Sequence, residues 1–368
     1  MKKTIAAMTT AALAAALLAG CGGTPDASSA QQGSQDSSTS QQTGAETRVV
    51  TDMGGTEVTL PAEVKSVVNL WPSSNSAMLA LGAGDLLVGT MDYTKELPWA
   101  NFVYPDIVNV ATATENAEEL LMMDPDVIIC PSPDTAEALN NAGLPAMYLM
   151  YNDYGSMREG VTLLGEILGG EYVQKAEDWC ALLDENLAVV DEALSGLSEE
   201  DKPLVYYIQG MTDGGLYTTY GANTIVGEWV NYAGGVFASD MLNLEGSQAQ
   251  AEEVLALDPD VVIIGGPAQH KLYNDLMADP AWQDITAVKE GRVYTNPMGL
   301  FPWDRYSLES ALQILWAAET LHPDLVDVDM VQKVQEFYQD FVGVELTEEQ
   351  AGYILAGLTP AGEIDYEG

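Results

Sequence analysis

Residues 117–129 read AEELLMMDPDVII, and 134 residues later the pattern returns as AEEVLALDPDVVI over 251–263, with nine of thirteen positions identical. In each copy an acidic pair begins a short helix, which an Asp-Pro pair ends because the residue before a proline avoids the α region. The apolar, β-branched run that follows is typical of a strand buried on both faces, as in a parallel sheet covered by helices. One repeat at so long a period indicates a duplicated lobe and not a solenoid.

Both lobes also open alike, with an apolar strand that runs into a loop and then a helix, at 67–75 and at 204–212. We therefore expect two open α/β lobes. Between them, apolar residues at steps of three and four predict a helix over 157–168 and, after Gly169-Gly170, a longer one over 173–194. With about 25 residues it would be about 37 Å long and would join the lobes as a strut. A coiled-coil seam is the alternative, but the run is only marginal in length for one.

The first residues have the pattern of a lipoprotein signal peptide. Lys2 and Lys3 precede a short apolar run, and Leu18-Ala19-Gly20-Cys21 is similar to a lipobox, so residues 1–20 are expected to be removed and Cys21 to carry a lipid. An ordinary secretory cleavage that leaves a free cysteine is the alternative. Residues 21–46 are too poor in apolar side chains to fold and predict a disordered tether. The rest divides into an N-terminal α/β lobe (47–155), connecting helices (156–199), a C-terminal α/β lobe (200–345) and a C-terminal tail (346–368).

The chain is strongly acidic, with 56 acidic against 13 basic residues. Such a surface repels nucleic acid, so we expect no nucleic-acid partner; solubility is its simplest meaning, and attraction of cationic ligands is the alternative. Two histidines are too few for a nitrogen-rich metal site, and no hydrolase elbow, zinc-protease motif or Walker loop occurs. We therefore expect no catalytic residues, no metal site and no intrinsic cofactor.

Taken in order, these features resemble the substrate-binding proteins of the ABC importers for iron-siderophores, haem and cobalamin. The resemblance covers about residues 47–345, and its specific stretches are the two repeats, YAGG at 232–235, GGP at 265–267 and the run from DPAWQ at 279 to 294. It implies the class III periplasmic-binding-protein architecture, two α/β lobes joined by one long rigid helix. It also implies a monomeric, lipid-anchored extracytoplasmic subunit that closes little and delivers its ligand to a permease and its ATPase subunits.

The same resemblance implies one carboxylate at the top of each lobe that docks onto arginines of the permease. The matching positions are Glu118 and Glu252, with the adjacent Glu119 and Glu253 as alternates. A Glu in the first helical turn is also stabilised by the helix dipole alone, so either residue is compatible with a generic helix start.

Loops that leave the carboxyl ends of the strands should hold the ligand. They are rich in aromatic side chains, which suit a bulky conjugated or catechol-bearing ligand, and Arg305 can pair with its carboxylate or phenolate oxygens. Each residue could instead pack within its lobe, and Arg305 could pair with Asp304 or Glu309. The expected ligand-binding residues are Trp71, Tyr93, Trp99, Tyr151, Tyr154, Tyr217, Tyr220, Trp303 and Arg305.

A ferric siderophore is the first choice of ligand, followed by haem or cobalamin, so the ligand itself can carry iron or cobalt. His270 or a tyrosine could coordinate that metal, whereas His322 is expected to be structural. The chain lacks an arginine cluster of the kind expected for triscatecholates, which leaves hydroxamate, haem and corrinoid ligands open. A lipid-anchored sensor with the same cleft and a metal-ion-binding protein are the alternatives.

Overall fold

The computed structural model describes residues 46–211, 215–221 and 223–365, and both expected α/β lobes are present. Cys21, the signal peptide and nearly all of the tether lie outside these ranges. Among the helices that the structure describes, each is too short or too polar to cross a membrane.

Lobe 1 is built on a parallel sheet of five strands in the order β5-β4-β3-β6-β7. An antiparallel hairpin, β1 (Thr47–Thr51) and β2 (Glu57–Pro61), precedes this sheet. The sheet strands are β3 (Val67–Asn69), β4 (Leu87–Thr90), β5 (Ala111–Thr112), β6 (Val127–Cys130) and β7 (Ala146–Tyr148). The helices of lobe 1 are α1 (Pro72–Ala80), α2 (Asp92–Glu96), α3 (Pro98–Val103), α4 (Ala117–Met123) and α5 (Pro133–Asn141).

Lobe 2 holds a parallel sheet of four strands in the order β11-β10-β8-β9. Its strands are β8 (Leu204–Ile208), β9 (Val236–Phe237), β10 (Val261–Ile264) and β11 (Val293–Thr295). The helices of lobe 2 are α8 (Ile225–Tyr232), α9 (Ala251–Leu257), α10 (Gln269–Ala278) and α11 (Thr286–Lys289). The strand order β9-β8-β10-β11 repeats the order β4-β3-β6-β7 of lobe 1, so the duplication seen in the sequence extends to the topology.

The two sequence repeats fold alike, each as a helix, a tight end and a fully buried strand. Their helices end at Asp124 and Asp258, as the Asp-Pro pairs predict, but both residues adopt the left-handed conformation, with φ of 47° and 48°. Aspartate tolerates this conformation better than most residues, and it reverses the chain more sharply than an extended residue would.

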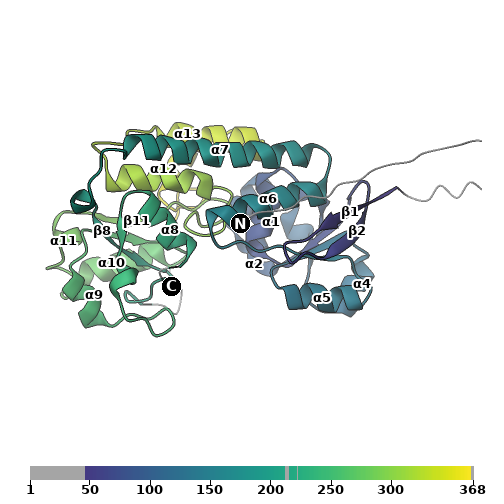
Figure 1. Ribbon diagram of the computed structural model, residues 1–368, viewed down its shortest axis with the longest axis horizontal. Coiled ribbons are helices and arrows are strands. Elements are labelled where there is room, and N and C mark those ends of the chain that lie inside the picture. Colours follow the sequence, from purple (N-terminus) through teal and green to yellow (C-terminus); the bar gives the residue numbers. More distant parts are fainter. Residues whose placement is uncertain (1–45, 212–214, 222, 366–368) are drawn as a thin grey trace, which may run out of the picture. The chain divides into compact units, whose positions relative to one another are not determined.

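Two helices join the lobes, α6 (Tyr154–Leu168) and the 23-residue α7 (Glu171–Ala193), close to the predicted bounds. Figure 1 shows α7 extending over both lobes, with α12 (Ser310–Leu321) beneath it. The Trp179 indole of α7 donates to the Leu308 carbonyl at 2.8 Å, and the Asn186 amide donates to the Ala311 carbonyl at 2.7 Å. The strut is therefore fastened to lobe 2 along its length.

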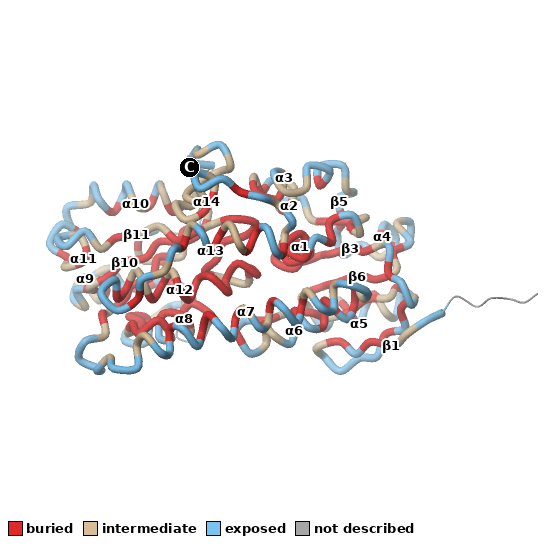
Figure 2. The backbone as a smooth tube through the Cα atoms, turned by 90° about the horizontal axis from the view of Figure 1, so that it is seen from above, coloured by how far each residue is buried: buried red, intermediate tan, exposed pale blue. Residues whose placement is uncertain are grey.

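The chain then returns toward lobe 1 through α13 (Met330–Phe337) and the one-turn helix η5 (Tyr338–Val342), which packs against α1. The segment predicted as a tail contains the helix α14 (Glu348–Leu355), which packs on α13. One buried apolar cluster consequently runs from lobe 1 through the joining helices into lobe 2, as the buried tube in Figure 2 shows, while smaller clusters line the other face of each sheet. A shared core of this kind resists large hinge motion between the lobes.

Candidate functional site

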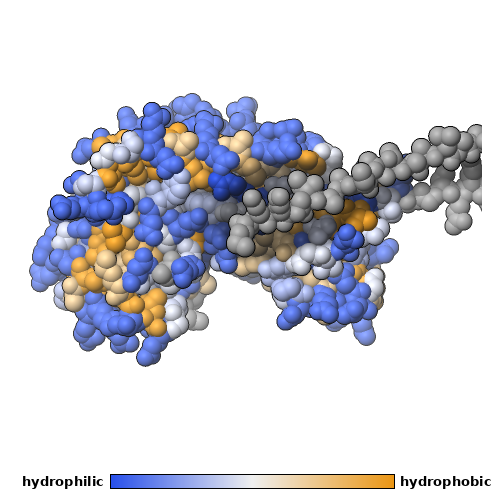
Figure 3. Space-filling view, in the orientation of Figure 1, coloured by the Kyte–Doolittle hydropathy of each residue, from blue (hydrophilic) through white to orange (hydrophobic). Residues whose placement is uncertain are grey.

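Aromatic side chains from both lobes meet between the lobes. Figure 3 shows the surface of the molecule hollowed between the lobes. The Trp71 ring, at the end of β3, lies 4.7 Å from the Tyr151 ring and 6.0 Å from the Tyr306 ring. Trp71 and Tyr151 are buried and come from lobe 1, whereas Tyr306 is half-buried and follows β11 of lobe 2. These three rings, which pack together between the two lobes, are called the aromatic floor below; Trp71 and Tyr151 belong to the buried cluster that the lobes share, and Tyr306 packs against it.

Tyr306 has a backbone conformation that only contacts from lobe 1 hold in place. Its φ of 48° is costly for a bulky residue. Its carbonyl accepts hydrogen bonds from Ser73 Oγ at 2.6 Å and from the Tyr151 hydroxyl at 3.2 Å. No pattern in the sequence singles out Tyr306 beyond its place beside Arg305, because these hydrogen bonds come from residues more than 150 positions away in the chain.

Above the floor, one wall of the cleft is the edge-on pair of Tyr93 and Phe301, whose ring centroids lie 6.3 Å apart across the lobes. Tyr93 is 39% exposed and is the most accessible of the aromatic residues expected to bind ligand. Burial raises the pKa of the Tyr93 phenol, as it does for Tyr207 and Tyr220 nearby. These phenols therefore stay protonated near neutral pH, and the exposed Tyr93 can donate a hydrogen bond to a ligand.

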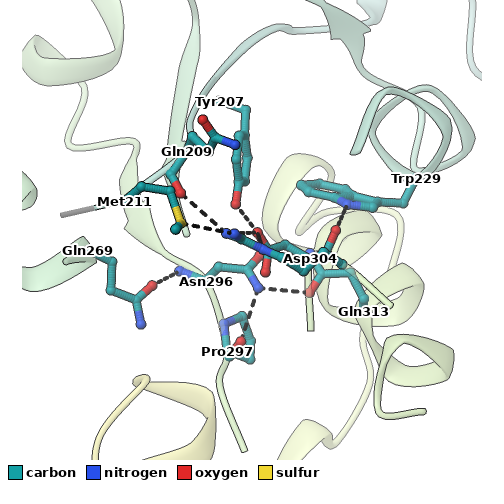
Figure 4. Close-up of polar contacts among 10 residues, drawn as sticks. Tyr207, Gln209, Met211, Trp229, Gln269, Asn296, Pro297, Asp304 and Gln313 are labelled. Atoms are coloured by element: carbon teal, nitrogen blue, oxygen red, sulfur yellow. Dashed lines mark hydrogen bonds and ion pairs between the residues drawn. The ribbon is translucent and has the colours of Figure 1, made fainter. Parts of the chain in front are cut away.

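The charged centre of the site is the pair Asp304 and Arg305. Arg305 donates to Asp304 Oδ2 from Nε at 3.1 Å and from Nη2 at 2.8 Å, and its guanidinium lies over the Tyr220 ring, 5.5 Å from the centroid. Figure 4 shows Tyr207 pointing at Asp304, to which its hydroxyl donates. Burial is the largest single influence on the pKa of Arg305 and lowers it, but Asp304, Tyr207 and Tyr220 together raise that pKa well above its usual value. The two side chains form a buried ion pair.

Two glycines make room for this pair. A side chain at Gly265 would collide with the Tyr207 hydroxyl and with Asp304, and a side chain at Gly210 would collide with the Gly265 carbonyl. The Gly-Gly-Pro stretch that supports the resemblance thus has a physical role, because it lets the two loops of lobe 2 close around Asp304.

Glu309 is fully buried and holds the loop that carries Arg305, a role that sequence reasoning missed. Its carboxylate accepts hydrogen bonds from the Tyr338 hydroxyl at 2.6 Å, from Ser307 Oγ at 3.0 Å and from the Phe301 amide at 3.2 Å. Burial raises its pKa despite these donors. Of the two partners expected for Arg305, the structure thus selects Asp304. In the sequence, Glu309 lies just before the helix α12, a position where acidic residues are common, and nothing there indicates that it is buried.

Four of the expected binding residues pack or bond within the protein and, among the described residues, make no ring or hydrogen-bond contact with Trp71, Tyr93 or Arg305. Trp303 is fully buried in the shared core, and Trp99 is buried with its indole donating to the Leu358 carbonyl at 2.9 Å. Tyr154 is buried, with its hydroxyl 3.4 Å from the Ser310 carbonyl. Tyr217 stacks on Trp282 at 5.8 Å, in the separate cluster on the other face of the sheet. The structure brings together Trp71, Tyr93, Tyr151, Tyr220 and Arg305.

Neither histidine lies free in solvent. His270 Nε2 is 3.1 Å from the carbonyl of Gly357, in the segment after α14, beside Trp99 of lobe 1. His322 Nε2 is 3.0 Å from the carbonyl of Gly234, in the YAGG turn, and burial lowers its pKa. His322 therefore has the structural role expected of it.

In the acidic pair at the start of α4, and likewise in that of α9, one carboxylate accepts hydrogen bonds from its own lobe and the other does not. Glu119 accepts from Thr114 Oγ1 at 3.1 Å, and Glu253 accepts from the side-chain amide of Asn243 at 2.9 Å and from its backbone amide at 3.2 Å. Glu118 and Glu252 are exposed, and within the described residues no hydrogen bond or ion pair engages either carboxylate. The geometry therefore favours Glu118 and Glu252 as the residues available to a partner.

Comparison with known proteins supports the architecture. A family model described as a periplasmic binding protein matches residues 67–298. An uncharacterised ABC transporter substrate-binding lipoprotein of Bacillus subtilis, YvrC, is 28% identical over 88% of this chain and 99% of its own. A cobalamin-binding protein of Halobacterium salinarum is 28% identical over 58% of this chain and 57% of its own. The crystal structure of a periplasmic solute-binding protein of Veillonella parvula superposes with a TM-score of 0.73, at 25% identity, covering 87% of this chain and all of that one.

Proposed function

Since the chain belongs to the periplasmic binding protein family and is the substrate-binding component of an ABC transporter, we propose that it captures a bulky iron-carrying or corrinoid ligand in the interlobe cleft. A ferric siderophore and a corrinoid are the leading candidates, with haem after them. The bound ligand would then be delivered to the permease and its ATPase subunits. Lipidated Cys21 would keep the protein at the outer face of the cell membrane.

The aromatic floor is the observation that carries the proposal. Trp71, Tyr151 and Tyr306 come from different lobes, yet their rings lie within about 6 Å of one another. Aromatic faces with polar tips bind large planar or catechol-bearing groups, and donors such as Ser73 and Tyr151 already organise this floor before a ligand arrives. A preorganised floor of this kind lowers the entropy cost of binding.

The exposed carboxylates Glu118 and Glu252, which we call the docking ends, support an importer in preference to a sensor that works without a permease. Glu118 and Glu252 occupy the same position of the two repeats, and in both repeats the neighbouring Glu is bonded within its own lobe. A sensor would have no need to keep one equivalent carboxylate free on each lobe. Matched free charges at two ends suit a partner with a matching pair of basic sites.

A ligand screen tests the proposal directly. The full chain, purified in detergent, would be mixed with ferrioxamine B, ferric enterobactin, cyanocobalamin, dicyanocobinamide and haemin, and unfolding would be followed by calorimetry. A ligand present at 100 times its dissociation constant raises the free energy of unfolding by about 2.7 kcal/mol, which moves the transition clearly. We expect at least one siderophore or corrinoid to do so, and quenching of tryptophan fluorescence should saturate at one ligand per chain. A transition that no compound moves would contradict the proposal.

A further inference from the structure

Arg305 is the one basic side chain of the described residues that faces the cleft, and its hydrogen bonds are directed into its own lobe. Beyond the two bonds to Asp304, Nη2 donates to the Gln209 carbonyl at 3.2 Å and Nη1 lies 3.5 Å from the Met211 sulfur. Figure 4 shows Gln209 and Met211 on the side of the cluster away from Trp229. The guanidinium N–H groups of Arg305 that could bind a carboxylate or phenolate of the ligand are therefore already engaged within lobe 2.

The remaining basic side chains do not compensate for this. Lys2 and Lys3 lie outside the described residues, and the other ten all have partners elsewhere. Seven of them pair with surface carboxylates: Lys65, Lys95, Arg158, Lys202, Lys271, Lys289 and Lys333. Three bond to backbone carbonyls: Arg48, Lys175 and Arg292. None is positioned to attract an anion into the cleft.

Carboxylates, by contrast, gather around the accessible wall of the cleft. Glu96 lies on α2 with Tyr93, and Asp365 lines a pocket with residues of the next helix, α3. Burial is the main cause of the raised pKa of Tyr93. The charges of Asp304, Asp365 and Glu96 add to it, whereas Arg305 lowers it. Asp365 and Glu96 are exposed, while Asp304 is fully buried. Asp304 also keeps its second oxygen, Oδ1, buried with no hydrogen-bond partner, so its charge is only partly compensated. The surroundings of Tyr93 thus carry three negative charges and one positive charge.

We propose that the cleft selects a neutral or cationic ligand and rejects polyanions, with Asp304 as the residue that sets this preference. The inference rests on the proposed function, because it describes the ligand of the same cleft. It favours a cationic ferric hydroxamate or a corrinoid over a ferric triscatecholate, and over haem with its two propionates. A polyanion would have to approach three carboxylates without an available guanidinium, and the repulsion between like charges at such short distances is only weakly screened by salt.

The test compares affinities for probes of opposite charge. Titrations of the full chain would use ferrioxamine B and dicyanocobinamide against ferric enterobactin and haemin. The wild-type protein should bind the better of the first pair at least about tenfold more tightly than either polyanion. The Asp304→Asn variant keeps the shape of the side chain but frees Arg305 from its counter-charge. It should decrease the ratio of these two affinities by about tenfold, chiefly because the polyanions bind more tightly.

A second variant protects the test against misfolding of Asp304→Asn. Glu96→Gln with Asp365→Asn removes two exposed charges, so we expect the fold to be retained. The ratio of the affinity for the neutral or cationic probes to that for the polyanions should decrease, as in Asp304→Asn. Glu137→Gln with Glu290→Gln makes the same charge change at exposed sites on α5 and just after α11, and should leave the ratio unchanged. Equal or tighter binding of a polyanion by the wild-type protein would overturn the inference alone, as would an unchanged ratio in the Glu96/Asp365 variant. Binding of none of the four probes would instead overturn the proposed function, and the inference with it.

Discussion

The two lobes share a topology and an exposed carboxylate at the same position of each repeat, Glu118 and Glu252, but their contributions to the cleft differ. Lobe 1 offers the uncharged Trp71, Ser73 and Tyr151, which fix the floor by packing and hydrogen bonds. Lobe 2 offers the buried pair of Asp304 and Arg305, enclosed by tyrosines. We infer that both lobes kept the exposed carboxylate proposed to meet the permease, whereas the residues proposed to contact the ligand came to differ between the lobes. On this view, lobe 1 supplies shape and lobe 2 supplies charge.

The largest effect is expected when Trp303 is replaced, and it should be a loss of stability. The comparison with Trp71 tests which aromatic residues of the loops serve packing and which serve ligand binding. Because its ring is fully buried, Trp303→Ala should lower the free energy of unfolding by about 3–5 kcal/mol. Chemical denaturation measures this loss. Trp71→Phe, on the floor formed by lobe 1, is the matched change and should weaken ligand binding with a smaller loss of stability. A Trp303→Ala protein of wild-type stability would show that the ring does not support lobe 2.

Trp303 also shows how far the sequence could lead. The lobes and the strut follow from a repeated pattern and from periodicity, which are local properties, whereas Glu118 and Glu252 follow from the resemblance to the family. Trp71 and Trp303 look alike in the sequence, since each lies beside a proline in a loop after a strand. In the structure both rings enter the buried cluster that the lobes share, but the Trp71 ring lies against Tyr151 and Tyr306 between the lobes, a contact that depends on residues far apart in the chain. The burial of Glu309 depends in the same way on Tyr338, 29 residues further along the chain.

Charge reversal at the docking ends tests what the lobes have in common. Glu118→Lys with Glu252→Lys should reduce ligand uptake by cells at least about tenfold, because each end would repel a basic site on the permease. Ligand affinity of the purified protein should be unchanged, since both carboxylates lie away from the cleft. Each single reversal should cause a similar partial loss if the two ends are equivalent.

Glu119→Gln with Glu253→Gln is the matched control for this experiment. These carboxylates bond within their own lobes, so their removal should affect uptake less than the reversal does. Normal uptake by the double Lys variant would contradict the docking assignment. A weakened binding curve would show instead that the helices α4 and α9 influence the cleft.

The smallest effect is expected from pH, and it should fall on lobe 2, which holds both histidines of the chain. Burial lowers the pKa of His322, so the unfolded chain takes up a proton near pH 6.5 while the folded protein does not. As the pH falls below about 6.5, the free energy of unfolding should therefore decrease, by less than about 1 kcal/mol at pH 5.5. His322→Asn can still bond to the Gly234 carbonyl and should lose less stability over the same range. Hydrogen exchange should report the loss first in β9 and the Gly234 turn, before lobe 1 changes; equal pH dependence in both proteins would show that His322 is not the group that titrates.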